Sequence, residues 1–203
     1  MSKSSALMVI DVQRDVVANA LETEKVVSNI NSLIEKARTD GTPVIWVQHS
    51  DDYLVKESAG WEFVPELVPG ASDVRIYKTH PSSFQETDLS QHLQALGTRH
   101  LVITGAQTDH CVNATSNAAV ELGFDVTLVG DAHTTEDTQS MSAPIDRGEE
   151  PAVCFSHSRQ SSDRRSSNRR GFVLNKALCH TNIEVAEFIL SEGIAVGKTK
   201  RFI

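Results

Sequence analysis

The alternation of short apolar runs with helix-like segments is the feature of this sequence that most restricts its fold. Runs rich in Val, Ile and Leu recur along the chain, at Ala6–Val12, Pro43–His49, Asp73–Lys78, Leu101–Gly105 and Asp125–Val129. Nearly continuous apolar runs of this length are typical of strands that are buried on both faces, as in a parallel sheet covered by helices. The pattern therefore predicts a three-layer α/β fold, in which a doubly wound, mostly parallel, Rossmann-like sheet lies between helices.

Three of the four segments between these runs have apolar side chains at helical spacing, and each of the three is followed by a glycine that would stop a helix. The expected helices are Val26–Ala37, Leu89–Leu96 and Val112–Leu122, and the glycines that follow them are Gly41, Gly97 and Gly123. Asp88 is expected to be the N-cap of the second helix. The order of strands and helices supports the predicted α/β fold.

The segment Pro144–Arg170 does not follow this pattern. It contains SHSRQSSDRRSSNRR, which lacks apolar periodicity and is positively charged in an acidic protein. We interpret it as a mobile inserted loop or as an artefact of the gene model. As a loop, it either has no role or forms a basic lid that attracts anionic substrates. Helical patterning resumes at Lys176 and predicts a closing helix through Leu190, and Ile194–Val196 is expected to form a short final strand. The whole chain, residues 1–203, is expected to be one domain with an insertion at about 144–170.

Composition excludes several functional classes. A chain of 203 residues can bury the core of a single domain. Its net charge of −8 argues against a general nucleic-acid binder. The apolar start of the chain is interrupted by Asp11, and it is too short for a signal-peptide core or a membrane span. The three cysteines, Cys111, Cys154 and Cys179, form no CxxC pair and no zinc-ligand spacing, which indicates a reducing compartment. We therefore expect a cytoplasmic protein without membrane or nucleic-acid partners.

Three polar residues lie where strands of the predicted sheet should end. Asp11 closes ALMVID, Lys78 follows RIY, and Cys111 comes just after LVITGAQTDH. In open α/β sheets, ligands bind outside the carboxyl ends of the strands at a topological switch point. If the strand order reverses between the first strand and the strand before Cys111, the side chains of Asp11 and Cys111 would face each other there.

The surroundings predicted for Cys111 would make its thiol reactive. The sequence CVNATSNAAVELG is helical in pattern, so the thiol would lie in a first turn, where the helix dipole favours a thiolate. A nearby Lys78 would lower the pKa of the thiol further, and Asp11 could accept its proton. Each residue also has a structural interpretation: a buried cysteine, a capping aspartate and a solvated lysine. Cys154 and Cys179 have weaker contexts and are interpreted as structural or incidental.

Three motifs resemble the isochorismatase-like cysteine hydrolases, a superfamily that includes nicotinamidases, N-carbamoylsarcosine amidohydrolases and isochorismatases. The motifs are ALMVIDVQRD, IYKTHPSSF and GAQTDHCVNATSNAAVELGFDVTLVGDAHTT, of which the last is long and specific. The resemblance covers Leu7–Thr135 and, loosely, the closing helix. It implies a parallel sheet of six strands and self-association into a dimer or tetramer.

The resemblance also assigns site residues. The acid, lysine and cysteine of the family match Asp11, Lys78 and Cys111. The family places a non-proline cis peptide bond at Ala106–Gln107, and it implies an oxyanion hole formed by the backbone N–H groups of Gln107 and Cys111. No cofactor is expected.

One departure from the family concerns metal binding. Nicotinamidases carry an Asp-x-His metal site after their second strand, whereas the corresponding segment here reads VQHSDDYL. A metal held by His49, Asp51 and Asp52 is one interpretation of this segment, and solvated turn residues are the other. No bound metal is expected.

These features predict hydrolysis of a C–N bond, amide or carbamoyl, in a small molecule through a thioester on Cys111. One alternative is isochorismatase-type vinyl-ether hydrolysis, with Asp11 as the acid and the cysteine dispensable. Another is a non-catalytic module that responds to redox conditions or forms oligomers. Trp61, Phe63 and Phe84 could line an apolar substrate pocket or could simply pack in the core. The expected partner is a small-molecule substrate of unidentified structure.

Overall fold

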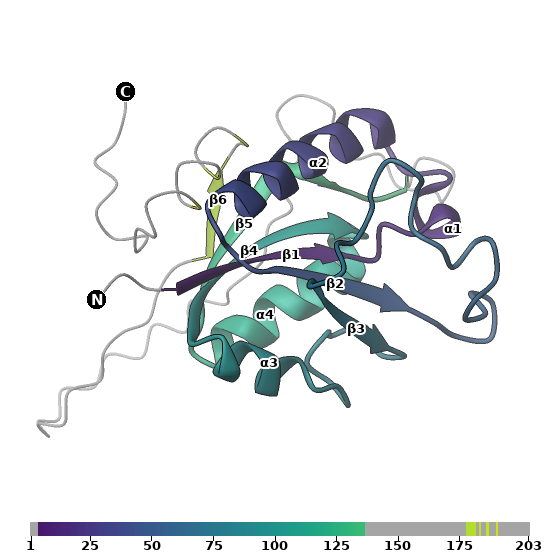
Figure 1. The fold of residues 1–203 in the computed structure, drawn as a ribbon. Coiled ribbons are helices and arrows are strands. Elements are labelled where there is room, and N and C mark those ends of the chain that lie inside the picture. Colours follow the sequence, from purple (N-terminus) through teal and green to yellow (C-terminus); the bar gives the residue numbers. More distant parts are fainter. Residues whose placement is uncertain (1–3, 137–177, 182, 184–185, 187–189, 191–203) are drawn as a thin grey trace, which may run out of the picture.

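The protein forms a single parallel sheet with helices on both faces. The computed structural model describes residues 4–136, 178–181, 183, 186 and 190. Within them the sheet has six strands in the order β3-β2-β1-β4-β5-β6, and every neighbouring pair is parallel (Figure 1). The strands are β1 (Ser4–Ile10), β2 (Val44–His49), β3 (Val74–Lys78), β4 (Thr98–Ala106), β5 (Asp125–Thr134) and β6 (Leu178–Thr181). The predicted α/β fold with a parallel sheet is confirmed.

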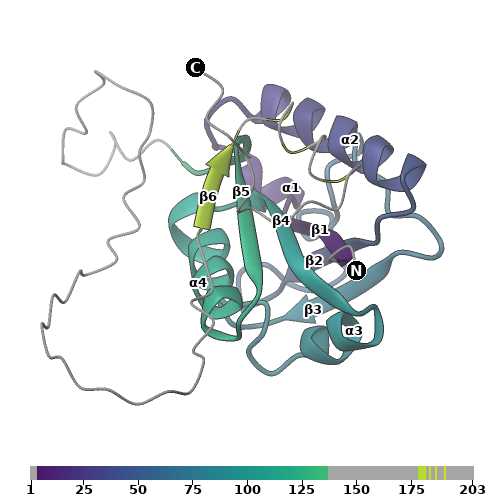
Figure 2. The same ribbon diagram turned by 90° about the vertical axis from the view of Figure 1, so that its left-hand side faces the viewer.

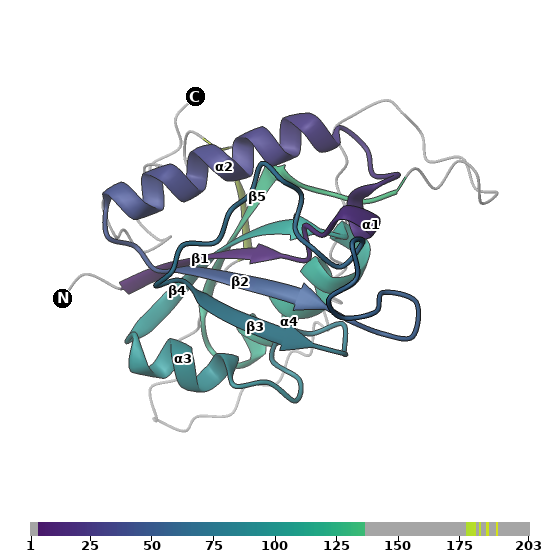
Figure 3. The same cartoon turned by 45° about the vertical axis from the view of Figure 1, so that its right-hand side comes forward.

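The helices form the two outer layers. They are α1 (Arg14–Val17), α2 (Thr23–Thr39), α3 (Leu89–Ala95) and α4 (Asn113–Glu121), and a single π-helical turn, η1 (Thr108–Val112), precedes α4. Helix α2 covers one face of the sheet, and α3 and α4 cover the other (Figure 3). None of the helices in the described part of the chain is both long enough and apolar enough to cross a lipid bilayer.

The central strand β1 shows why the apolar runs predicted the fold. Its side chains alternate between the two faces. Leu7 and Val9 pack in the core beneath α2, whereas Met8 and Ile10 pack in the core beneath α3 and α4. All four side chains are fully buried. A strand that is apolar on both faces needs helices on both sides, which is the three-layer arrangement.

The helix ends agree with the sequence in part. Gly97 and Gly123 follow α3 and α4 with φ angles of 65° and 89°, the left-handed conformation that glycine adopts readily. Asp88 occupies the N-cap position of α3, but its side chain makes no capping hydrogen bond. Its Oδ2 atom instead lies 3.2 Å from Nε2 of His92, one turn along the helix. The predicted N-cap position of Asp88 is therefore confirmed, although its side chain does not cap the helix.

The last strand differs from the prediction. Leu178–Thr181 pairs with β5 at the edge of the sheet (Figure 2), although its sequence was read as the start of helical patterning. A four-residue segment is too short to reveal a period, and its strand conformation comes from pairing with β5. The closing helix is supported, since Ile183, Ala186 and Leu190 are helical. The segment at 144–170 and the proposed strand Ile194–Val196 lie outside the described residues.

The topology places a switch point beside β1. From β1 the chain adds β2 and β3 on one side and then crosses to β4 on the other. The crossovers therefore diverge at the carboxyl ends of β1 and β4, which is where open α/β sheets bind ligands.

Candidate active site

Asp11 follows directly after β1 in an uncommon backbone conformation. Its φ angle is 51°, and its side chain is 1% exposed. The neighbouring residue of β4 is Gly105, which pairs with Ile10 and has a φ angle of 117°. A Cβ atom at Gly105 would lie 2.0 Å from the carbonyl oxygen of Ile10. Glycine thus allows β4 to approach the end of β1 at the point where the chain turns to place Asp11.

Lys78, the last residue of β3, extends its buried side chain to Asp11. Its Nζ atom lies 2.6 Å from Oδ2 of Asp11, and both side chains are almost completely excluded from solvent. The same Nζ atom donates a hydrogen bond to Sγ of Cys111 at 3.2 Å. The structure therefore brings together the three residues that the sequence placed at separate strand ends.

Cys111 lies in the π-helical turn η1, between β4 and α4. The N–H of Val112 donates to the carbonyl of Gln107 at 3.2 Å, a five-residue step that widens the turn. The thiol therefore precedes the first residue of α4, whereas the sequence placed it within the first turn of the following helix. The peptide bond between Ala106 and Gln107 is cis, at the position that the family resemblance implied.

Burial governs the charge state of the thiol. It raises the pKa of Cys111 to about 12, the negative charge of Asp11 acts in the same direction, and Lys78 opposes both. The expectation of a thiolate in the resting protein is therefore wrong, because the cost of desolvating the thiolate exceeds the stabilisation by one lysine. The neutral thiol donates a hydrogen bond to the Asp11 carboxylate.

The same effect strengthens Asp11 as a proton acceptor. Burial raises the pKa of Asp11 above its ordinary value, and the charge of Lys78, a hydrogen bond from Lys78 and the hydrogen bond from Cys111 oppose this rise. Since a carboxylate of raised pKa is a stronger base, the site is suited to taking the thiol proton during attack.

His49 is a member of this cluster for which the sequence suggested only a metal ligand or a solvated turn residue. It is the last residue of β2 and pairs with Lys78 of β3. Its Nδ1 atom lies 3.4 Å from Nζ of Lys78, and its Nε2 atom lies 3.2 Å from Oδ2 of Asp51. Its position at the end of a strand beside Lys78 is the signal that could have identified it.

The residues once considered for metal binding form a turn. Oδ1 of Asp51 accepts hydrogen bonds from the N–H groups of Tyr53 and Leu54 at 2.8 and 2.7 Å, and Asp52 is exposed. This geometry agrees with the interpretation of VQHSDDYL as turn residues. Across the ranges that the structure describes, no three His, Cys, Asp or Glu side chains are grouped to hold a metal ion.

Gln13 is a second residue that the sequence did not identify. Its fully buried amide donates to the carbonyls of His49 and Trp61 at 2.9 and 2.8 Å, and it accepts from the N–H of His49 at 2.8 Å. It thereby joins the segment after β1 to the end of β2 and to the loop before β3. A polar residue two positions after Asp11 was the available signal.

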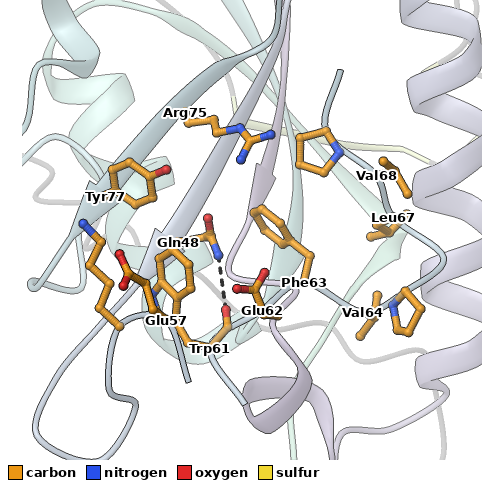
Figure 4. A pocket seen from close by; sticks show the side chains of 13 residues that line it. Gln48, Glu57, Trp61, Glu62, Phe63, Val64, Leu67, Val68, Arg75 and Tyr77 are labelled. Atoms are coloured by element: carbon orange, nitrogen blue, oxygen red, sulfur yellow. Dashed lines mark hydrogen bonds between the residues drawn. The ribbon is translucent and has the colours of Figure 1, made fainter. Parts of the chain in front are cut away.

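The proposed pocket residues lie in different surroundings. Trp61 stacks on Tyr77, with ring centroids 5.8 Å apart, and lines a pocket of about 450 Å³. Figure 4 shows these two rings on one side of the pocket and Val64, Leu67 and Val68 on the other. The lining includes none of Asp11, Lys78 and Cys111.

Of the other two aromatic residues, Phe63 packs in the core and the partly buried Phe84 packs against it. Phe63, which also lines the pocket, meets Trp46 edge to face at 5.0 Å. Phe84 stacks on Phe124 at 5.9 Å and packs against the same apolar cluster as Cys111. A substrate-binding role for Trp61 and Phe84 stays a prediction.

Comparisons with known proteins agree with the fold and the motifs. The family model that describes the isochorismatase domain matches residues 5–156. A streptothricin hydrolase from Streptomyces noursei is 34% identical over 138 residues, which cover 65% of this chain and 50% of that protein. The ureidoacrylate amidohydrolase RutB from Caulobacter vibrioides is 29% identical over 140 residues, which cover 53% of this chain and 62% of that protein.

A solved structure extends the likeness to nearly the whole chain. An isochorismatase-family crystal structure from Burkholderia xenovorans superposes with a TM-score of 0.74 at 26% identity, covering 97% of this chain and 92% of that one. The two hydrolases named above are matched over only about half to three fifths of their length.

Proposed function

Because this chain belongs to the isochorismatase family, we propose that it is a hydrolase that cleaves a C–N bond, amide or carbamoyl, of a small molecule through a thioester on Cys111. The observation that carries the proposal is the position of the Lys78 ammonium, which touches both the Asp11 carboxylate and the Cys111 sulfur in a buried cluster. A thiol, a base and a fixed positive charge in contact are the components of an activated cysteine nucleophile.

The first half of the proposed reaction forms the thioester. Asp11 accepts the thiol proton while Sγ of Cys111 attacks the carbonyl carbon of the substrate. The backbone N–H groups of Gln107 and Cys111 donate to the oxygen of the tetrahedral intermediate. Asp11 then returns the proton to the leaving nitrogen, the C–N bond breaks, and the amine departs.

The second half releases the acid. Asp11 takes a proton from water as the water attacks the thioester carbonyl, and the C–S bond breaks. The proton on Asp11 then passes to the departing sulfur and restores the resting thiol. In both halves the positive charge of Lys78 stabilises the developing thiolate and holds Asp11 in place.

The relatives support a C–N bond as the target. One matched relative is named as an amidohydrolase of ureidoacrylate and another as a hydrolase of streptothricin. The matches cover only 50% and 62% of these two proteins, so the substrate here is proposed as a class. A small-molecule substrate and self-association likewise stay predictions.

A second candidate function is acid catalysis of vinyl-ether hydrolysis. The raised pKa of Asp11 favours it, since a carboxyl group in an apolar site can keep the proton that it must donate. In that chemistry Asp11 protonates the substrate and Cys111 is dispensable.

Screening small amides and ureido compounds for ammonia release tests the first function. We expect release with at least one compound, and we expect the Cys111→Ala variant to lose it while keeping the circular dichroism spectrum of the wild-type fold. Undiminished turnover by Cys111→Ala would reject thioester chemistry and favour the acid mechanism. Mass spectrometry after treatment with a carboxamide electrophile tests the non-catalytic alternative, which predicts no preference for Cys111 over Cys154 and Cys179.

A further inference from the structure

The ammonium group of Lys78 has three neighbours that can accept its hydrogen bonds. They are Oδ2 of Asp11 at 2.6 Å, Sγ of Cys111 at 3.2 Å and Nδ1 of His49 at 3.4 Å. Each lies on a different element: the end of β1, the turn η1 and the end of β2. A lysine ammonium has three protons and no acceptor, so these contacts account for all of its donors.

The partners of His49 determine the tautomer of its ring. Because Lys78 only donates, Nδ1 must be the unprotonated acceptor. Because the Asp51 carboxylate only accepts, the proton must lie on Nε2, which is 3.2 Å from Oδ2 of Asp51. The other oxygen of Asp51 is held by two backbone N–H groups of the following turn. This carboxylate is therefore in place to fix the ring before any substrate arrives.

The backbone of His49 is also fixed. Its N–H donates to Oε1 of Gln13 at 2.8 Å, and its carbonyl accepts from Nε2 of the same side chain at 2.9 Å. Ring and backbone are thus held by separate partners, and the side chain is only 18% exposed. Packing alone does not require separate hydrogen-bond partners for the ring and the backbone of a histidine. Together these partners fix the orientation of the His49 ring against the buried Lys78.

We propose that His49 is a positioning residue, which uses its neutral Nδ1 atom to hold the Lys78 ammonium between Asp11 and Cys111. The proposal rests on the function given above and deepens it. Without the third acceptor, the ammonium would turn toward the stronger charge of Asp11 and away from the sulfur. The thiolate that forms during attack would then lose part of its stabilisation.

The rate of alkylation of Cys111 by iodoacetamide measures this effect without a known substrate. Peptide mass spectrometry at a fixed pH would follow the second-order rate in the wild type and in four variants. His49→Leu removes the acceptor, and we expect it to slow alkylation roughly tenfold, as for the loss of one hydrogen bond to a charged group. His49→Asn can place a side-chain oxygen near the position of Nδ1, and we expect it to stay within about threefold of the wild-type rate.

The Asp51→Asn variant tests whether the tautomer of the His49 ring matters, because it leaves the ring itself in place. The new amide keeps an oxygen for the two N–H groups of the turn, but its NH₂ group faces Nε2 and shifts the ring proton to Nδ1. We expect this variant to be as slow as His49→Leu. His92→Leu is the matched control, because His92 makes the same 3.2 Å contact with a carboxylate on the exposed surface of α3, and its rate should equal that of the wild type.

The outcomes decide the proposal independently of the hydrolase function. Equal rates for His49→Leu and the wild type, or equally large losses for His49→Leu and His49→Asn, would overturn the role of Nδ1. The hydrolase proposal fails if the Cys111→Ala variant keeps its turnover, which is a separate experiment. Even then, the alkylation rates of Cys111 would show whether His49 positions Lys78.

Discussion

Replacing Lys78 by methionine leaves the carboxylate of Asp11 without its counter-ion in a buried site. Asp11 is 1% exposed, and it would have to be either an unpaired charge or protonated. The free energy needed to protonate Asp11 sets an upper limit on the folding stability that is lost through its unpaired charge. At pH 7 this limit is about 4.4 kcal/mol, the difference between the pH and the ordinary pKa of 3.8 multiplied by 1.36 kcal/mol per pH unit. At pH 5 the same limit is about 1.6 kcal/mol.

The sign of the pH dependence follows from proton linkage. Lys78 lowers the pKa of Asp11, so its removal raises that pKa further above 3.8 than in the wild type. The folded variant then binds more protons than the unfolded chain over a wider pH range, and its free energy of unfolding falls more as the pH rises. We therefore expect the stability lost in Lys78→Met to increase from pH 5 to pH 7, by up to about 2.7 kcal/mol. Urea unfolding of both proteins at the two pH values measures this difference.

A double variant isolates the carboxylate. Lys78→Met combined with Asp11→Asn has no charge at either position, and we expect its stability penalty relative to the wild type not to increase between pH 5 and pH 7. A penalty for Lys78→Met that is the same at both pH values would refute the reasoning. So would a double variant whose penalty increases with pH as much as that of the single variant.

Three further predictions follow from the same site. The alkylation rate of Cys111 should rise about tenfold per pH unit from pH 7 to 10, since burial places the thiol pKa at about 12, and a plateau below pH 9 would contradict this. Gly105→Ala should cost several kcal/mol of stability in urea unfolding because its Cβ would meet the Ile10 carbonyl, whereas Gly97→Ala, with a positive φ but open space, should cost only about 1–2 kcal/mol. Equal losses would mean that the contact between β1 and β4 relaxes. Gln13→Leu leaves the backbone groups of His49 and Trp61 without their hydrogen-bond partner and should lower folding stability by about 3 kcal/mol or more. A loss of stability under about 1 kcal/mol would show that these groups find other hydrogen-bond partners.

The fold was predictable because its main signal is strong. A strand such as β1, buried on both faces, must be apolar throughout, so its sequence differs from that of any half-exposed strand. The register of the sheet then places Asp11 and Lys78 at the same edge. The four residues of β6 carry no comparable signal, because their conformation depends on pairing with β5 rather than on their own pattern.

The electrostatics of the site were predictable only in part. The sequence indicated that Lys78 would favour the thiolate, and it does lower the pKa of Cys111. It did not reveal how deeply the thiol is buried, and burial decides the net direction. The contact of His49 with Lys78 could not be predicted from the sequence for a different reason. It depends on the pairing of β2 with β3 and on the turn that holds Asp51 in place.

A covalent intermediate on Cys111 is the central claim, and rapid-quench mass spectrometry tests it most directly. With a compound that the protein hydrolyses, the account predicts an acyl adduct on the peptide that contains Cys111, formed as fast as the amine is released in the first turnover. Amine release without any adduct on that peptide, at a rate unchanged in Cys111→Ala, would contradict it.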